Sequence, residues 1–233
     1  MRSAGCIVND IVDRQYDKKV YRTKNRPIAS GKVSLKLGFI YVSVLCLIAL
    51  LVLLQFNKLT IILALASMPL AFSYPYMKRF TYWPQLFLGI TFNYGLLLGW
   101  TSVQENLNLI PIIFYIGAIF WTLGYDTIYG YQDIKDDEII GVKSTSIKFK
   151  NSPKKFLSLC YLITLSSIII IGLSMNFNNA YYLFLSIPAI HMFFQIKKLN
   201  IIDDNMCLKI FKSNNILGLF IFINLLIGKL ISI

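Results

Sequence analysis

The sequence predicts an all-α protein, a polytopic bundle of helices that cross a membrane, and three observations carry this prediction. Hydrophobic residues make up 56% of the chain and charged residues only 15%, with a mean hydropathy of +0.62. Water-soluble domains do not have this composition. Apolar windows recur at lengths that cross a hydrocarbon core of about 30 Å as helices. These windows contain Gly, Pro and Ser and lack the alternating pattern of a membrane β-barrel, so helices are favoured over strands.

Seven windows are long enough to cross a membrane as helices, and we expect all seven to do so. They lie near residues 36–55, 59–77, 82–101, 109–131, 156–175, 180–196 and 214–232. Residues 1–17 are expected to form the inner end of a further helix that is too short to span on its own. This segment lacks the long apolar stretch and the cleavage site of a signal peptide. We therefore expect Met1 to be an internal residue of a longer protein, or a late start codon. We also expect residues 1–233 to form a single domain.

The positive charges indicate how the helices are oriented. The formal net charge is +12. Of the 23 Lys and Arg, 21 fall in residues 2–36, in the pair Lys78 and Arg79, and in residues 135–155 and 197–212. These segments alternate with loops that hold almost no basic residues, so the positive-inside rule places them in the cytoplasm or its equivalent. Topology and lipid contact thus account for the charge, and we do not expect nucleic-acid binding.

An acidic cluster lies near the start of the chain, where the first helix is expected to end. Asn9, Asp13 and Asp17 are spaced i, i+4, i+8, and Asp10 lies one position off that row. On a helix these residues share one broad face. A helix C-terminus already carries partial negative charge, so carboxylates gathered there are unfavourable unless a cation binds them.

A second acidic cluster begins inside the window that starts at residue 109. Asp126, Tyr129, Asp133 and Asp137 are spaced i, i+3, i+7, i+11, which again predicts one face of a helix. Counting the spans gives this helix and the first helix the same direction across the membrane. The two acidic faces should therefore meet at one membrane surface.

The two clusters together predict a site for magnesium and phosphate. Oxygen ligands with no His or Cys nearby suit Mg²⁺, which keeps several waters and binds through a few carboxylates plus substrate phosphates. Neighbouring basic residues would hold the phosphate oxygens; they are Arg22, Lys24, Arg26, Lys78, Arg79 and Lys143. The alternative is that these loops are solvated and that their charges pair among themselves as topological signals.

Both clusters lie in motifs that resemble the two aspartate-rich motifs of the UbiA superfamily of intramembrane aromatic prenyltransferases. The motifs are NDIVDRQYD followed by RTKNRPIASG, and DTIYGYQDIKDD followed by GVKST. The stretch FSYPYMKRFTYWPQLFLG also resembles a loop between the middle helices of that family, so the resemblance runs over most of the chain. Within the superfamily the motifs are most similar to the branch that prenylates 4-hydroxybenzoate in ubiquinone biosynthesis. The family has nine transmembrane helices, and this sequence is expected to lack the first and most of the second.

The resemblance implies an enzyme that transfers a polyprenyl group from polyprenyl diphosphate to the ring carbon ortho to the hydroxyl of 4-hydroxybenzoate. It implies that the Mg²⁺ ligands are Asn9, Asp13, Asp17, Asp133 and Asp137. It implies that the diphosphate is held by Arg22, Lys78, Arg79 and Lys143. The residues expected to take part in catalysis are Asp13, Asp17, Asp133, Asp137 and Arg79. Aromatic faces would stabilise the allylic cation; the first candidates are Tyr74 and Tyr129, followed by Phe72, Tyr76 and Tyr125.

Other interpretations stay open at the level of the sequence. Haem, menaquinone, chlorophyll and archaeal lipid prenyltransferases of the same superfamily share the chemistry but use other acceptors. A transporter would place charges near the bilayer midplane, whereas here they lie at one end of the helices. The abundance of Ile, Lys and Asn favours a bacterial cell inner membrane, with the mitochondrial inner membrane as the alternative. We expect the active-site loops on the cytoplasmic side.

Overall fold

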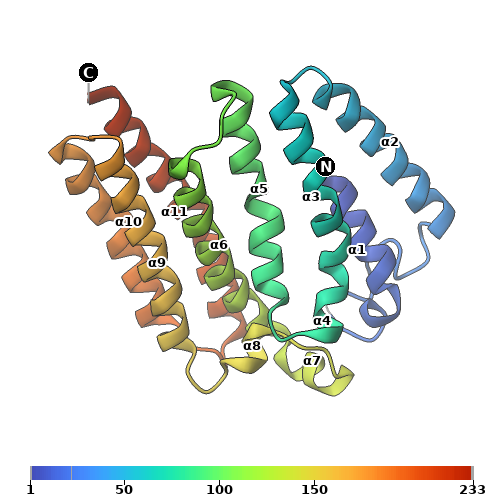
Figure 1. Ribbon diagram of the computed structural model, residues 1–233. Helices are drawn as coiled ribbons and strands as arrows, with labels where there is room; N and C mark the ends of the chain where they lie inside the picture. Colours follow the sequence, from blue (N-terminus) through green and yellow to red (C-terminus); the bar gives the residue numbers. More distant parts are fainter. Residues whose placement is uncertain (1, 22, 232–233) are drawn as a thin grey trace.

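The computed structural model describes residues 2–21 and 23–231, which form helices joined by short loops, with no strand among them. The longer helices are α1 (Arg2–Asp17), α2 (Leu35–Leu53), α3 (Lys58–Ser73), α5 (Pro84–Gln104), α6 (Leu109–Gly130), α9 (Pro153–Ser174), α10 (Asn179–Lys198) and α11 (Asp204–Ile231). Short helices follow α3 and α6: η1 (Tyr74–Tyr76), α4 (Met77–Phe80), η2 (Tyr131–Asp133), α7 (Ile134–Ile140) and α8 (Thr145–Lys148) (Figure 1). The prediction of an all-α membrane bundle is confirmed.

Six of the described helices are long and apolar enough to cross a membrane. They cover residues 35–53, 58–80, 84–104, 109–140, 153–174 and 204–230. The seventh expected span forms helix α10, close to its expected bounds, but it is not one of the six. The reason is that Asn179, His191 and Gln195 lower its hydropathy. Gln195 is buried between helices, so α10 carries polar groups on its protein-facing side.

Local chemistry sets where several spans begin. Asn57, Asn108 and Asn178 each precede a helix, and the side-chain oxygen of each accepts a hydrogen bond from a backbone N–H in the first turn. Such caps satisfy donors that have no partner within the helix. Pro84 and Pro153 open α5 and α9, where a proline costs no hydrogen bond. The spans thus have defined starting points at both ends of the bundle.

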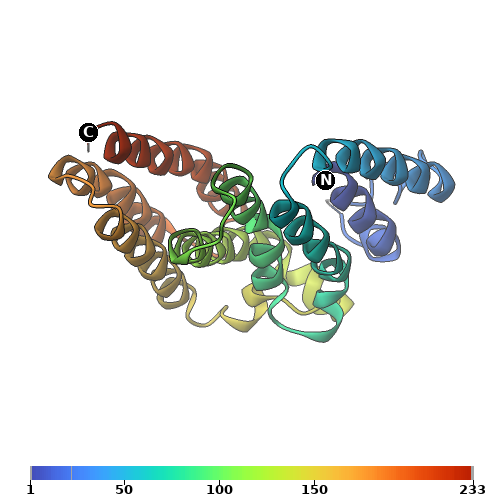
Figure 2. The same cartoon turned by 45° about the horizontal axis from the view of Figure 1, so that its top comes forward.

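Helix α6 lies at the centre of the arrangement and packs against α5, α9 and α11. Helices α9 to α11 lie on one side of it, and α5, α3 and the pair α1 and α2 follow on the other (Figures 1 and 2). Small residues permit the close contacts: a Cβ at Gly117 of α6 would collide with Ser167 of α9, and one at Gly89 of α5 would come within 2.9 Å of the Ile119 carbonyl oxygen. Membrane helices commonly pack through such small residues.

The two acidic clusters lie at the same end of the bundle, as predicted. The last turns of α1 and α6, together with α4, α7 and α8, gather at the lower end in Figure 1. Two local predictions were wrong. The second cluster does not lie on one continuous helix, because α6 ends at Gly130 and a 3₁₀ turn separates it from α7. Lys78 and Arg79 lie in the short helix α4 and not in a loop.

Candidate active site

A polar cavity of about 200 Å³ opens at this end of the bundle. Its walls come from α1, the segment after α1, η1, α4, the start of α5, the end of α6, η2, α7 and the segment after α7. Most acidic and amide side chains of the two predicted clusters line it: Asn9, Asp13, Asp17, Asp126, Asp133 and Asp137, whereas Asp10 is not among the lining residues. The structure therefore brings together the residues that sequence spacing placed on two separate faces.

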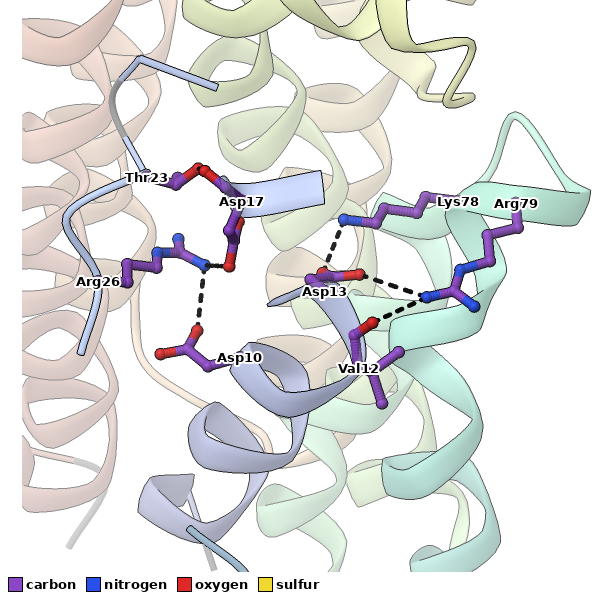
Figure 3. Close-up of polar contacts among 8 residues, drawn as sticks. All are labelled: Asp10, Val12, Asp13, Asp17, Thr23, Arg26, Lys78 and Arg79. Carbon is purple, nitrogen blue, oxygen red and sulfur yellow. Dashed lines mark hydrogen bonds and ion pairs between the residues drawn. The ribbon is translucent and has the colours of Figure 1, made fainter. Parts of the chain in front are cut away.

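On the α1 side, Asp13 is held by two bases from α4. Nζ of Lys78 lies 2.6 Å from Oδ2 of Asp13, and Nη2 of Arg79 lies 3.9 Å from Oδ1 (Figure 3). The same Nη2 donates a hydrogen bond of 3.0 Å to the Val12 carbonyl oxygen. The guanidinium group also lies 5.2 Å from the ring centre of Tyr16. Arg79 thus fixes the last turns of α1 while Lys78 supplies most of the neutralising charge.

A third base, Arg26, neutralises the other two carboxylates of this cluster. Nη1 of Arg26 lies 3.1 Å from both Oδ1 of Asp10 and Oδ2 of Asp17. The Thr23 hydroxyl donates a hydrogen bond of 3.0 Å to the Asp17 carbonyl oxygen. These contacts fold the segment after α1 back over the end of that helix, as Figure 3 shows. Arg26 lines the cavity, so its charge is available there.

Asp13 is the carboxylate of the α1 cluster whose charge is most costly to bury. Its relative exposure is 3%, and Oδ1 accepts no hydrogen bond from the described residues. Helix α1 is not one of the six candidate spans. Burial raises the pKa of the Asp13 carboxyl, although the Lys78 ammonium opposes this shift. The two bases therefore compensate its charge incompletely, and a further cation would stabilise it.

The donor set fits Mg²⁺ that arrives with a phosphate ligand. Among the described residues, no three His, Cys, Asp or Glu side chains lie close enough to hold a metal ion by themselves. Mg²⁺ does not need such a cage, because it commonly uses one or two carboxylates together with substrate phosphates and water. Oδ1 of Asp13, which accepts no hydrogen bond from the described residues, and the carboxylates of Asp133 and Asp137 provide oxygen ligands from α1, η2 and α7 around one cavity.

The segment after α7 closes the cavity and contributes a further base. Gly141 ends α7 with φ of 78°, a conformation that favours glycine. The chain then returns so that Lys143 N donates a hydrogen bond of 2.8 Å to the Lys78 carbonyl oxygen. Lys143 and Ser144 line the cavity. The bases of α4 and of this segment are therefore joined through the backbone.

Most residues predicted from the sequence line the cavity. They are Asn9, Asp13, Asp17, Arg26, Lys78, Asp126, Asp133, Asp137, Lys143, Tyr74 and Tyr129. Arg79 contacts Asp13 and Val12 and is not among the lining residues. Arg22 lies outside the described residues. Lys24 and three further aromatic candidates are also absent from the lining: Phe72, Tyr76 and Tyr125.

Sequence reasoning missed several residues of the site. Tyr16, Thr23, Gln85 and Ser144 line the cavity but belong to neither acidic row. Gln85 had a detectable signal, since it is a polar residue near the start of an apolar window. Ser144 also had one, because its side chain caps α8 by accepting from the Ile147 N–H. Neither signal indicated a place beside the acidic clusters.

The fold and the cavity define an intramembrane protein whose polar site can hold a polyanion together with a divalent cation. The chain belongs to the UbiA prenyltransferase family, which it matches over residues 1–226. It is 44% identical over 231 residues to the mitochondrial 4-hydroxybenzoate polyprenyltransferase of Bos taurus, and the match covers 99% of this chain but 62% of the bovine protein. It is 42% identical to 4-hydroxybenzoate geranyltransferase 1 of Lithospermum erythrorhizon, over 99% of this chain and 75% of that protein.

Solved structures show the same fold. A UbiA homolog from Aeropyrum pernix has a TM-score of 0.82 at 21% identity, covering 98% of this chain and 86% of that one. A UbiA homolog from Archaeoglobus fulgidus, bound to GPP and Mg²⁺, has a TM-score of 0.69 at 16% identity, covering 97% and 83%. At these identities the likeness establishes the fold alone.

Proposed function

We propose that residues 1–233 form one intramembrane prenyltransferase domain that transfers a polyprenyl group to 4-hydroxybenzoate. The donor is a polyprenyl diphosphate, and the new bond forms at the ring carbon ortho to the hydroxyl, as in ubiquinone biosynthesis. The observation that carries the proposal is one cavity, at the end of the spans, lined by both acidic segments and by Lys78, Arg26 and Lys143. The names of the bovine and Lithospermum relatives support the acceptor.

The cavity residues have complementary tasks toward the donor. Asn9, Asp13 and Asp17 of α1, together with Asp133 and Asp137 of the second acidic segment, would hold Mg²⁺, which when bound neutralises the diphosphate and makes it a better leaving group. The Archaeoglobus homolog with GPP and Mg²⁺ supports this choice of ion. Lys78, Lys143 and Arg26 add positive charge where the leaving diphosphate accumulates negative charge.

Aromatic side chains face the allylic cation that remains when the diphosphate leaves. Tyr74 and Tyr129 line the cavity, and ring faces stabilise cations at short range. The site must exclude water, because water would capture the cation. The ring carbon of the acceptor then forms the new bond, and loss of its proton restores the aromatic ring. The apolar tail of the donor stays among the helices and lipid.

The proposed location is an inner membrane, with the cavity on the cytoplasmic side or its equivalent. The six apolar helices indicate a multi-pass membrane protein. The relatives from Bos taurus and Homo sapiens are mitochondrial by name, which supports the mitochondrial alternative. The basic segments after α1, α7 and α10 lie at the cavity end, in agreement with the positive-inside rule.

Prenyl transfer by isolated membranes tests the proposed function. Membranes from a host without its own 4-hydroxybenzoate prenyltransferase would receive polyprenyl diphosphates of several lengths and 4-hydroxybenzoate, with products identified by mass spectrometry. We expect an ortho-prenylated product, and a loss on the order of 10³-fold in rate for Asp133→Ala. Glu138→Ala is the matched control, because Glu138 lies in α7, directly after the 3₁₀ turn that ends at Asp133, but not on the cavity wall. Product only with 1,4-dihydroxy-2-naphthoate or with a glycerol phosphate lipid would overturn the choice of acceptor.

A further inference from the structure

The segment Gly141–Ser146, here called the strap, runs from the end of α7 into the first turn of α8 and borders the cavity. Val142, Lys143 and Ser144 form its inner face and line the cavity. A strap of irregular backbone must find partners for its buried N–H and C=O groups, and those partners fix its position. The position of Lys143 and Ser144 therefore depends on the hydrogen bonds that hold the strap.

One of these bonds comes from a side chain of α5. The backbone N–H of Thr145 donates a hydrogen bond of 2.9 Å to Oε1 of Gln85, and both groups are buried. Gln85 is in the first turn of α5, is 8% exposed, and lines the cavity. The other end of its amide lies beside Gly130 of α6: a Cβ at Gly130 would be 3.5 Å from Nε2 of Gln85. Gln85 thus fills the space between the strap, α5 and α6.

Further bonds hold the strap at Lys143, Thr145 and Ser146, and Gln85 is the side chain that ties it to α5. Lys143 N donates to the Lys78 carbonyl oxygen at 2.8 Å. The Thr145 hydroxyl lies 2.6 Å from the Thr127 hydroxyl, and the Ser146 hydroxyl donates to the Thr127 carbonyl oxygen at 2.8 Å. These contacts join the strap to α4 and α6, whereas Gln85 joins it to α5.

We propose that Gln85 is a positioning residue for the diphosphate of the donor: its Oε1 holds the backbone of Thr145 so that Lys143 and Ser144 stay on the cavity wall. The inference rests on the proposed function, because it assigns the strap to the donor and not to the aromatic acceptor. Loss of the acceptor oxygen leaves the Thr145 N–H buried without a partner, and the strap moves away from the cavity to hydrate that group. Lys143 moves with it, and the donor diphosphate binds less tightly.

Two variants separate the hydrogen bond from the shape of the side chain. Gln85→Met keeps the length of the side chain and removes the acceptor, whereas Gln85→Glu keeps an acceptor oxygen. Gln104→Met is the matched control, because Gln104 lies in the exposed last turn of the same helix, at the end away from the cavity. All three proteins are compared with the wild type at equal amounts in detergent.

Tryptic cleavage after Lys143 reports the position of the strap without any ligand. Cleavage after Lys150, in the exposed turn that follows α8, is the internal reference. We expect Gln85→Met to raise the ratio of the two cleavage rates about tenfold, and Gln85→Glu and Gln104→Met to leave it unchanged. An unchanged ratio in Gln85→Met would show that the bond does not hold the strap and would overturn the proposal.

Binding of inorganic diphosphate in the presence of Mg²⁺ reports the role in the site. We expect its Kd to rise about tenfold in Gln85→Met and to stay unchanged in Gln104→Met, with a raised KM for the polyprenyl donor and an unchanged KM for the acceptor. Faster cleavage with unchanged diphosphate binding would overturn the positioning role and leave a purely structural one. If the wild type binds diphosphate but does not prenylate 4-hydroxybenzoate, the proposed function fails while the role of Gln85 is still measured.

Discussion

Lys78 of α4 forms an ion pair with Asp13 of α1, with Nζ 2.6 Å from Oδ2, and this contact joins α4 to α1 at the cavity. The Asp13 side chain is 4% exposed and the Lys78 side chain 26%. Removing one partner of such a pair leaves a poorly solvated charge, which costs more than the pair itself contributes. Loss of either partner alone is therefore expected to destabilise the fold.

The first prediction concerns this pair. We expect Lys78→Met to lower the free energy of unfolding by about 1–3 kcal/mol, because it leaves the Asp13 carboxylate buried without its main partner. Adding Asp13→Asn to the same protein should recover most of that stability but none of the activity. Thermal unfolding in detergent, arranged as a double-mutant cycle, measures the coupling. Simple addition of the two single effects would show that the contact contributes nothing.

The second prediction separates the positive charge of Arg79 from the planar geometry of its guanidinium group. Its Nη2 bonds to the Val12 carbonyl oxygen at 3.0 Å and lies 3.9 Å from Oδ1 of Asp13, which places the end of α1. Arg79→Lys keeps the positive charge that orients the helices but loses the planar fork. We expect normal insertion with prenyl transfer reduced roughly 10–100-fold, and a larger loss in Arg79→Ala. Full activity in the Lys variant would show that only the positive charge of Arg79 matters. Lost insertion would show that Arg79 acts in orienting the helices in the membrane.

The orientation of the bundle is the third prediction. Asn106 lies in the loop between α5 and α6, at the end of the bundle away from the cavity, and Lys150 lies beyond α8 at the cavity end. A cysteine at position 106 should react from the outer face with a reagent that cannot cross the membrane. One at position 150 should react only after the membrane is opened. The exposed Cys6 and half-buried Cys46 must be replaced by Ser first. Reaction of both positions from one face contradicts the charge-based orientation.

The fourth prediction concerns Gly130, where α6 ends against the strap. A Cβ at this position would collide with the Ser146 hydroxyl, which bonds to the Thr127 carbonyl oxygen. We expect Gly130→Ala to lower the free energy of unfolding by about 1–3 kcal/mol through this overlap. Gly99→Ala is the matched control, because no atom lies within 4 Å of its Cβ position and alanine favours a helix. Equal thermal stability of the two variants would contradict the close contact between α6 and the strap.

The sequence predicts the helices well because their signals are local. Apolar length places the spans within a few residues, and the spacing of Asn9, Asp13 and Asp17 predicts a shared face that the structure confirms. The breaks between helices are harder to predict from the sequence. The turn at Tyr131–Asp133 and the helix that carries Lys78 depend on contacts with other parts of the chain, which periodicity does not describe.

The local sequence pattern also does not predict which side chains of the site contact one another. Lys78 and Arg26 were predicted as phosphate ligands, and the structure shows that they also neutralise carboxylates of α1. Gln85 was missed, because a single polar residue in an apolar window gives no indication of what it faces. Its partner, the Thr145 N–H, lies on a distant segment that only the tertiary fold brings to α5.

Binding of geranyl diphosphate to the purified protein, with and without Mg²⁺, tests the central claim that both acidic segments hold one metal-bound diphosphate. Titration calorimetry on the wild type, Asp13→Asn and Asp137→Asn gives the three dissociation constants under matched conditions. We predict binding that depends on Mg²⁺ in the wild type and a rise in Kd of at least about tenfold in each variant, since the two residues line the same cavity from α1 and α7. Equally tight binding without Mg²⁺, or a loss in only one of the two variants, would contradict a shared site.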